Sequence, residues 1–294
     1  MKKILITGAN SYVGDCVKNY LINKNEGFKV SVLDQINPDW IKEDFSVYDV
    51  IYHVSGIAHS DSGKISEAKA ALYDKVNHVL AAETAKKAKA EGVKQFIFMS
   101  SAIVYGESSK TGGKKVIEKD TPLAPANAYG KSKQDAEKDV LALSDKDFKT
   151  VILRCPMIYG KNCKGNYNAL RKIALKLKFF PYVKNQRSML YIENLCEFVY
   201  LMIKNGESGI FFPSNKEYSN TSEMIKLIAA AHGKKTVLLK GFTPILKFLG
   251  LFTSKVSKAF GSLSYDEKIS EYEVDYRVKT LSESIAEIET ETET

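Results

Sequence analysis

The first 34 residues constrain the fold of this chain more than any other stretch. An apolar segment at residues 2–7 runs directly into a glycine-containing turn at 8–14, and a helical pattern then leads to a second apolar segment at 29–33, followed by Asp34. A strand, a glycine turn, a helix, a second strand and an acid in this order are typical of a dinucleotide-binding βαβ unit.

The turn has the properties that a pyrophosphate requires. A helix N-terminus presents free N–H groups and a positive dipole end, and Gly8 and Gly14 allow the backbone to come close. Ser11 stands where a middle glycine would be expected, but its small hydroxyl side chain can donate to phosphate. An ordinary βα turn capped by Asn10 or Ser11 is the structural alternative. Asp34, 20 residues after Gly14, is placed to accept hydrogen bonds from an adenosine ribose.

The alternation of strands and helices continues through the first half of the chain. A long helical pattern at 66–91 contains Asn77, and further strands are predicted at 49–55, 94–101 and 150–154. This order predicts a parallel sheet with helices on both faces, and ligands bind beyond the carboxyl ends of such strands. Asp34, Gly56 and Ser101 would all lie at that edge. Beyond residue 160 the alternation thins, which indicates a smaller substrate lobe.

Tyr129 and Lys133 are four residues apart on a predicted helix and therefore share one of its faces. A phenol normally loses its proton near pH ~10, and an ammonium group nearby stabilises the phenolate. Such a tyrosine can exchange a proton with an alcohol or a ketone near neutral pH. Because lysine is abundant in this chain, a chance surface pair is the alternative for this spacing taken alone.

Composition narrows the class of protein. A chain of 294 residues suits one large α/β domain, or one such domain with a smaller lobe. The four cysteines lack CxxC spacing and are interpreted as buried thiols in a reducing compartment, so we expect a cytoplasmic protein. The apolar start is too short for a signal peptide, and no apolar run approaches the length of a membrane span. We expect no metal.

The net charge of +8 does not indicate nucleic acid, because the basic excess is nearly all lysine and arginine occurs only four times. Residues 236–263 are apolar and lysine-rich. They could lie on a membrane surface as an amphipathic segment, or pack as a helix over the substrate lobe. The last residues, 286–294, are acidic and of low complexity, and we expect them to be disordered.

Taken together, these segments resemble the extended short-chain dehydrogenase/reductase superfamily, in its NAD-dependent epimerase/dehydratase branch. The resemblance rests on Thr7, Gly8, Gly14, Asp34, Asn77, residues 100–106, Tyr129, Lys133, and residues 154–160, 187–192 and 275–285. It implies a Rossmann-type doubly wound parallel sheet with a smaller C-terminal substrate lobe. Residues 1–160 would form the NAD-binding domain with the catalytic helix, and 161–285 mainly the substrate-binding lobe. It also implies a homodimer.

The resemblance assigns roles to individual residues. Tyr129 would be the acid/base, Ser101 would bind the substrate oxygen beside it, and Lys133 would bind the nicotinamide ribose and lower the pKa of Tyr129. Arg187 and Asn166 would contact the substrate, with the planar guanidinium of Arg187 on a diphosphate. The residues expected to bind the cofactor are Gly8, Asn10, Ser11, Tyr12, Val13, Gly14, Asp34, Val54, Ser55, Gly56, Asn77, Ser100, Tyr129, Lys133 and Pro156.

The two residues after the active-site hydroxyl narrow the reaction. Dehydratases of the family place an Asp-Glu pair there, and this chain has Ala102 and Ile103, which disfavours dehydration. Residues 154–167, with Met157 where UDP-galactose-type epimerases usually carry Asn, look more like bacterial enzymes acting on UDP-N-acetyl-6-deoxyhexosamines for surface polysaccharides. Asp34 favours NAD over NADP, because a carboxylate repels the 2′-phosphate.

Two enzyme classes and one other class stay open from the sequence. We expect an epimerase that transfers hydride at C4 of a UDP-hexose or UDP-N-acetylhexosamine. A UDP-4-keto-6-deoxy-sugar reductase is the alternative, because both reactions need only hydride transfer and one tyrosine acid/base. A catalytically silent dinucleotide-binding regulatory protein is the alternative of another class, and the intact Ser101, Tyr129 and Lys133 argue against it.

Overall fold

A computed structural model describes residues 1–57 and 65–290 of the chain. They form two compact units. Unit 1 comprises Met1–Gly106, Pro122–Cys155 and Leu195–Pro213, and unit 2 comprises Glu107–Thr121, Pro156–Asn194 and the described part of Ser214–Thr294. The roles predicted for residues 1–160 and 161–285 stay predictions, because packing into units does not show what either one binds.

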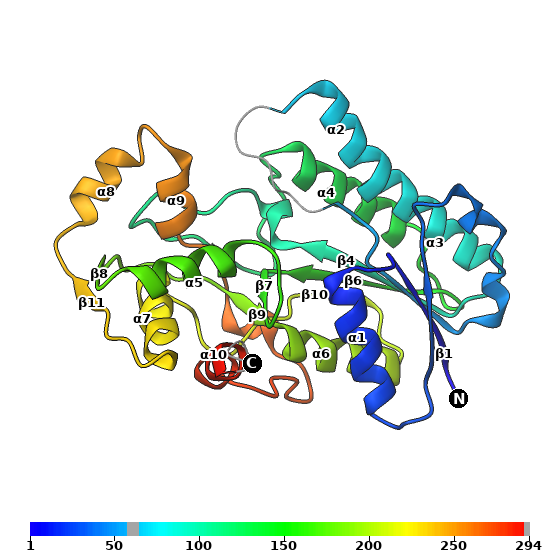
Figure 1. The fold of residues 1–294 in the computed structure, drawn as a ribbon. Coiled ribbons are helices and arrows are strands. Elements are labelled where there is room, and N and C mark those ends of the chain that lie inside the picture. The colour runs from blue at the N-terminus through cyan, green and yellow to red at the C-terminus, as the bar shows by residue number, and fades with distance from the viewer. Residues whose placement is uncertain (58–64, 291–294) are drawn as a thin grey trace. The chain divides into compact units, whose positions relative to one another are not determined.

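Unit 1 contains a parallel sheet, and its described strands number six, in the order β10-β6-β4-β3-β1-β2 (Figure 1). Their bounds are β1 Lys3–Thr7, β2 Lys29–Leu33, β3 Val50–His53, β4 Gln95–Ser101, β6 Lys149–Cys155 and β10 Gly209–Phe211. The central strands are buried along almost their whole length, as expected of parallel strands covered on both faces. The predicted α/β class with a parallel sheet is confirmed.

Helices cover both faces of this sheet. α1 (Tyr12–Asn23) and the part of α6 (Ile192–Asn205) that belongs to unit 1 lie on one face, and α3 (Leu80–Ala90) and α4 (Ala128–Leu141) lie on the other (Figure 1). The strand order reverses between β1 and β3. From β1 the chain continues outward to β2 on one side, and from β3 it continues to β4 on the other. In open parallel sheets this reversal opens a crevice at the carboxyl ends of the strands, where ligands bind.

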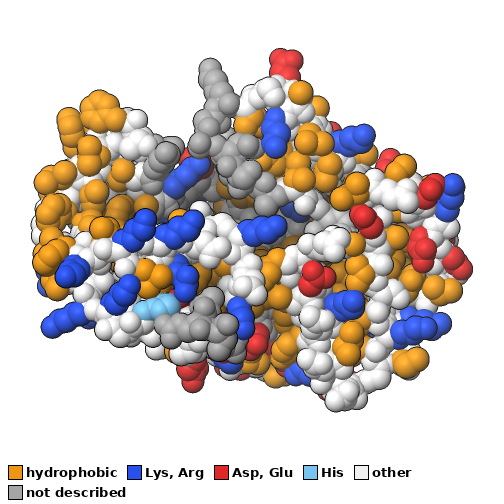
Figure 2. Space-filling model, viewed as in Figure 1, with side chains coloured by type: hydrophobic (Ala, Val, Ile, Leu, Met, Phe, Trp, Pro, Cys, Tyr) orange, Lys and Arg blue, Asp and Glu red, His pale blue; other side chains and the backbone are white. Residues whose placement is uncertain are grey.

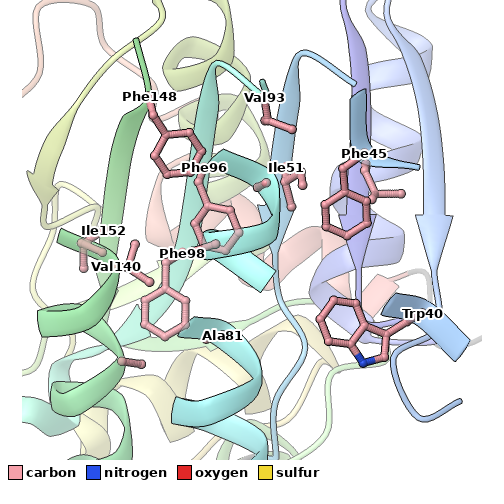
Figure 3. Close-up of a cluster of buried hydrophobic side chains, with 14 residues drawn as sticks. Trp40, Phe45, Ile51, Ala81, Val93, Phe96, Phe98, Val140, Phe148 and Ile152 are labelled. Atoms are coloured by element: carbon pink, nitrogen blue, oxygen red, sulfur yellow. The ribbon is translucent and has the colours of Figure 1, made fainter. Parts of the chain in front are cut away.

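The core of unit 1 fills the space between the sheet and α3 and α4. Its buried side chains include Phe96 and Phe98 on β4, Phe148 directly before β6, Ile152 on β6, and Trp40 (Figure 3). Trp40 comes from a short 3-10 helix at Pro38–Lys42, and a second 3-10 helix follows at Phe45–Val47. Residues between β2 and β3 thus close the end of the core with a large aromatic side chain.

The helix predicted at 66–91 is continuous but changes its hydrogen-bond pattern midway. α2 (Glu67–Tyr73) is followed by a π-helical turn at Asp74–Val79, and α3 continues directly from it. A π turn inside an α-helix often marks a functional position. Asn77, the residue singled out in the sequence, lies within this turn and is fully buried.

Unit 2 is built from helices and short pairs of strands. Its helix α7 (Thr221–Ala231) packs against α5 (Asn166–Lys176) and α10 (Leu281–Thr290). The smaller helices are α8 Thr243–Leu249 and α9 Ser254–Phe260. The described parallel pairs join β7 Met157–Tyr159 with β9 Met189–Tyr191, β8 Phe179–Pro181 with β11 Val237–Leu239, and β5 Val116–Ile117 with β12 Ser264–Tyr265.

The prediction of a disordered tail at 286–294 is wrong for its first five residues. Residues 286–290 continue α10, in which Ile288 and Glu289 are buried. The buried carboxylate of Glu289 accepts hydrogen bonds from the Tyr167 hydroxyl and from Arg171 Nε, and these contacts order a segment whose acidic composition indicated disorder. Residues 291–294 lie outside the described part of the chain.

Candidate active site

The carboxyl end of β1 approaches the end of β3 so closely that only glycine fits between them. Gly8 has φ +85°, and a Cβ on it would lie 2.9 Å from the backbone nitrogen of Ser55. Its own N–H donates to the carbonyl of Leu33 at 3.0 Å, which ties the turn to the end of β2. Val54 and Ser55, both predicted cofactor contacts, therefore lie directly against the turn.

The turn ends at the N-terminus of α1. Ser11 is the N-cap of this helix, and its hydroxyl oxygen accepts a hydrogen bond from Gly14 N–H at 3.2 Å. A Cβ on Gly14 would lie 2.5 Å from that oxygen and 3.1 Å from Val54 Cγ2, so this glycine allows α1 to pack on the sheet. Tyr12 and Val13 belong to the first helical turn, whose N–H groups have no partner within the helix.

Asp34 follows β2 and is exposed, with its Oδ1 accepting a hydrogen bond from Ile36 N–H at 2.9 Å. The next residue, Gln35, is buried and fastens two strand ends together. Its Oε1 accepts from the Ser55 hydroxyl at 2.6 Å, and its Nε2 donates to Thr84 Oγ1 at 2.8 Å. The Asp34 carboxylate, which was predicted to bind a ribose, thus lies at the surface directly before the buried and hydrogen-bonded Gln35.

Asn77 connects the segment after β3 to the helix that carries Tyr129 and Lys133. Its Oδ1 accepts from Ile57 N–H at 2.8 Å, and its Nδ2 donates to Ile57 O at 3.2 Å and to Ser132 Oγ at 3.3 Å. A Cβ on Gly56 would lie 2.9 Å from Asn77 Oδ1 and 3.5 Å from Lys133 Nζ. These contacts give Asn77 a structural role, in addition to the cofactor contact that the sequence predicts for it.

Tyr129 lies in the first turn of α4, whose N-cap is Asn127. Ser101 is the last residue of β4, and its hydroxyl forms a hydrogen bond with the Tyr129 hydroxyl while its Oγ also accepts from Ile103 N–H at 3.3 Å. The ring of Tyr73 packs beside Tyr129, with 5.8 Å between ring centroids. The two hydroxyl groups that the sequence predicted to act together are brought together.

The pKa of Tyr129 differs from its predicted direction. Burial raises this pKa above the ordinary value of 10, and the hydrogen bond from Ser101 opposes the rise without overcoming it. The causes of this pKa are burial, the Ser101 hydroxyl and the Cys155 thiol, so the lowering predicted for Lys133 stays a prediction. Lys133 Nζ donates to the carbonyl oxygen of Met99, at 2.9 Å.

Lys133 is only 6% exposed and lies over the ring of Phe98, with Nζ 4.7 Å from the ring centroid. Burial lowers the pKa of its ammonium to about 8, against the opposing charge of Glu137. At neutral pH this lysine is thus protonated but close to the point at which it loses its proton. A buried amine with a shifted pKa at a sheet edge is typical of a functional site.

Glu137, one turn after Lys133, is a site residue that the sequence reasoning missed. Its carboxylate accepts from the Arg154 Nε at 3.2 and 3.1 Å and from Arg154 Nη2 at 2.7 Å. The hydroxyl of Ser100 also donates to it, and Arg154 Nη1 donates to the Tyr105 hydroxyl at 2.6 Å. The spacing of four between Lys133 and Glu137 was the available signal, because it places both on one face of α4.

Three predicted site residues belong to unit 2. Pro156 is half-buried and precedes β7, and Asn166 is the exposed first residue of α5. Arg187 is half-buried, and its Nη1 donates to the Lys258 carbonyl at 2.7 Å and to the Gly261 carbonyl at 3.4 Å. Burial lowers the pKa of its guanidinium. The ligand roles of all three stay predictions.

The residues of unit 1 fit a dinucleotide. Gly8, at φ +85°, lets the turn lie directly against the backbone of Ser55, and the first turn of α1 supplies backbone donors to a pyrophosphate. Asp34 supplies acceptors for a ribose. Lys133, beside Gly56 and Asn77, supplies a cation one helical turn from Tyr129.

Comparison with known proteins agrees with this geometry. The model of the NAD dependent epimerase/dehydratase family matches residues 4–212. A relative named UDP-glucose 4-epimerase, from Vibrio cholerae, is 30% identical over 289 residues, which cover 90% of this chain and 87% of the relative.

Solved structures with the same fold include enzymes of two kinds. A dTDP-4-dehydrorhamnose reductase from Bacillus anthracis str. Ames, in complex with NADP, has a TM-score of 0.75 at 17% identity and covers 99% of this chain and 100% of its own. A UDP-glucuronic acid 4-epimerase from Bacillus cereus, in complex with NAD, has a TM-score of 0.71 at 18% identity with the same coverage. At these identities the likeness shows the fold alone.

Proposed function

Because the chain belongs to the NAD-dependent epimerase/dehydratase family, whose members depend on a nicotinamide dinucleotide, we propose that it inverts the C4 hydroxyl of a UDP-linked hexose or N-acetylhexosamine with NAD as cofactor. The observation that carries the proposal is the hydrogen bond between Ser101 and Tyr129, one helical turn from the buried Lys133. The Vibrio cholerae relative, a UDP-glucose 4-epimerase by name, supports the substrate class. The resemblance of residues 154–167 supports a role in surface polysaccharide synthesis.

The chemistry divides between the cofactor and three side chains. A bound nicotinamide supplies the acceptor and donor of the hydride at C4. Tyr129 moves the proton: its phenolate oxygen takes the proton of the C4 hydroxyl, and its phenol returns a proton to the ketone oxygen. The Ser101 hydroxyl donates a hydrogen bond to the same substrate oxygen. Lys133 holds ribose hydroxyls and places a positive charge near the phenolate.

The raised pKa of Tyr129 sets a requirement for this mechanism. Burial favours the neutral phenol, so the phenolate must be stabilised by a nearby positive charge. The group that carries this charge must itself stay protonated although it is buried. Lys133 can provide that charge at neutral pH, because its pKa is about 8. We infer that its ammonium exchanges the Met99 carbonyl for the active-site hydroxyls when the site is filled.

The cofactor preference rests on Asp34. Its exposed carboxylate follows β2, and a second negative charge on the 2′-oxygen of an adenosine ribose would be repelled by it. We therefore propose NAD rather than NADP.

A UDP-4-keto-6-deoxy-sugar reductase is the second candidate, favoured by the sequence of residues 154–167. A reductase would use the same proton transfer from Tyr129 and only the returning half of the reaction. Dehydration is not proposed, because Ala102 and Ile103 provide no carboxylate after Ser101. Ala102 is also buried, at 5% exposure.

The test is incubation of the purified protein with UDP-glucose, UDP-N-acetylglucosamine and a UDP-4-keto-6-deoxy sugar, with and without NADH. Interconversion of C4 epimers without added reductant supports the epimerase, and stoichiometric oxidation of NADH supports the reductase. Tyr129→Phe should lower kcat by roughly 10²- to 10⁴-fold in the reaction that is found. Tyr48→Phe, which removes a hydroxyl bound to Glu43 at the surface, is the matched control. Full activity of Tyr129→Phe would refute the mechanism.

A further inference from the structure

We propose that an apolar, lysine-bordered surface of unit 2 docks on a membrane that contains anionic lipids. The surface is formed by β11, α8, residues 240–242 and residues 250–253, together with Phe179 on the neighbouring strand β8. The inference is independent of the sugar and of the reaction, because it rests on the exposed side chains of this surface alone.

The first observation is the charge of the segment. Residues 224–265 contain seven lysines and no aspartate or glutamate, although these two acids make up 35 of the 294 residues of the chain. An uninterrupted basic segment of this length attracts anionic surfaces, and its attraction weakens with salt.

The second observation is the exposure of large apolar side chains in the same segment. Leu251 is 70% exposed, Phe252 74%, Phe248 60% and Ile245 55%, and Phe179 on β8 is 60% exposed. Every residue of α8 is at least partly exposed to solvent. Hydrophobic side chains gather over α8 and the adjoining β8 and β11, and lysine or arginine side chains lie along their border (Figure 2). A patch of this kind marks an interaction surface.

One end of the surface is attached to the rest of unit 2, and the other end, at Phe248 and Phe252, is exposed. The attached end is tied to unit 2 by the pairing of β11 with β8, by the rings of Phe260 and Phe180 at 5.7 Å, and by the Thr221 hydroxyl, which donates to the Ala259 carbonyl at 2.6 Å. At the exposed end, Phe248 and Phe252 pack edge to face on each other, with 5.2 Å between centroids. The alternative of a helix packed over the substrate lobe describes α8 only in part. Thr243 and Lys247 lie beside Gly112, but Ile245, Phe248 and Leu249 remain exposed.

The combination of charges and apolar groups favours a lipid surface over other partners. Exposed lysines at 234, 235, 240, 247 and 258 would meet lipid phosphates, while Phe and Leu side chains reach the acyl boundary beneath them. A second copy docked on the same face would bring these lysines opposite one another. No helix in the described part of the chain is long and apolar enough to cross a membrane, so the contact would be peripheral.

The experiment is co-sedimentation of the full chain with large vesicles of pure phosphatidylcholine, or of phosphatidylcholine with about one third phosphatidylglycerol. We expect binding to the anionic vesicles at low salt, at least tenfold weaker binding to the neutral ones, and release of the protein by 0.5 M NaCl. The double variant Phe248→Ser/Phe252→Ser should lower the partition coefficient at least tenfold. Val274→Ser/Val278→Ser, which removes two exposed apolar side chains elsewhere in unit 2, is the matched control and should bind like the wild type.

A second variant, Lys240→Glu/Lys247→Glu, tests the charges without touching the apolar groups. It should abolish the preference for anionic vesicles, and thermal unfolding should show that it remains folded. Three results would overturn the proposal: no binding to either vesicle, binding unaffected by both double variants, or a dimer in solution that Phe248→Ser/Phe252→Ser dissociates. The last result would identify a second copy of the chain as the occupant of this surface.

Discussion

Each unit of this protein buries a carboxylate against an arginine. In unit 1, Glu137 of α4 is 2% exposed and is bound by Arg154 through two nitrogens. In unit 2, Glu289 of α10 is 1% exposed and accepts from Arg171 Nε at 2.6 Å and from the Tyr167 hydroxyl at 2.8 Å. The chemistry of the two pairs is the same, but their surroundings differ.

The difference lies in the elements that each pair aligns. Glu137 is on the helix that carries Tyr129 and Lys133, and its partners Ser100 and Arg154 lie near the carboxyl ends of β4 and β6. This pair fixes α4, with the proposed acid/base Tyr129, against the carboxyl edge of the sheet. Glu289 instead joins α10 to α5 and, through His232, to the end of α7. The same interaction therefore positions the proposed site residues in unit 1 and holds helices together in unit 2.

Removing one partner of each pair should separate these roles. Glu137→Gln should lower the free energy of unfolding by about 3–5 kcal/mol, because the buried guanidinium of Arg154 loses its counter-charge. Glu289→Gln should lower it by less, because the guanidinium of Arg171 is partly exposed to water. Urea unfolding measures this loss. Only Glu137→Gln should also lower kcat of the folded protein, since only this carboxylate aligns the helix of Tyr129. An equal loss of kcat in both variants would contradict the comparison.

Lys133 provides a smaller effect that depends on pH. The folded protein holds its proton up to a pKa of about 8, whereas the unfolded chain holds it up to about 10.5. Between these values the unfolded state binds more protons, so the free energy of unfolding should rise with pH by ~3 kcal/mol. Below pH 8 both states are protonated and the dependence ends.

Lys133→Met removes the titrating group and should remove this rise. The measurement is urea unfolding of both proteins at pH 7.5, 8.5 and 9.5, below the range in which tyrosines titrate in the unfolded chain. Parallel curves for the two proteins over this range would show that the Lys133 pKa is not depressed.

A substitution at Arg187 tests whether unit 2 binds the substrate. If it binds the substrate diphosphate, Arg187→Ala should raise KM by roughly 10- to 100-fold with little change in kcat, which corresponds to the loss of charge-assisted hydrogen bonds worth about 1.5–3 kcal/mol. Arg187→Lys should restore part of the affinity, because it keeps the charge but lacks the planar fork. An unchanged KM for Arg187→Ala would leave this arginine with its contacts to the Lys258 and Gly261 carbonyls as its only role.

The smallest expected effect concerns Asp34. Asp34→Asn keeps an oxygen that can accept from Ile36 N–H and removes only the negative charge. The ratio of dissociation constants for NADP and NAD should then shift toward NADP by about tenfold, or about 1.4 kcal/mol. Isothermal titration with each dinucleotide measures the ratio. No shift would remove the role proposed for this carboxylate.

The sequence alone predicted those features that depend on neighbouring residues. The βα turn from Gly8 to Gly14 and the shared face of Tyr129 and Lys133 are local patterns, and local hydrogen bonds and helical spacing produce them in the fold. The strand β10 escaped prediction because three residues, Gly209–Phe211, carry no measurable period. The order of strands in the sheet was likewise beyond reach, because it depends on which buried faces meet.

Tertiary structure alone decided the environment of the site. Glu137 meets Arg154 from another element, and Asn77 meets Ile57 and Ser132, so no spacing along the chain predicts these contacts. The direction of the Tyr129 pKa was decided in the same way. The sequence places an ammonium four residues away, but burial, which only the fold creates, raises this pKa above its ordinary value. Local pattern determines which groups are present, and desolvation, which only the packed structure creates, determines their charge.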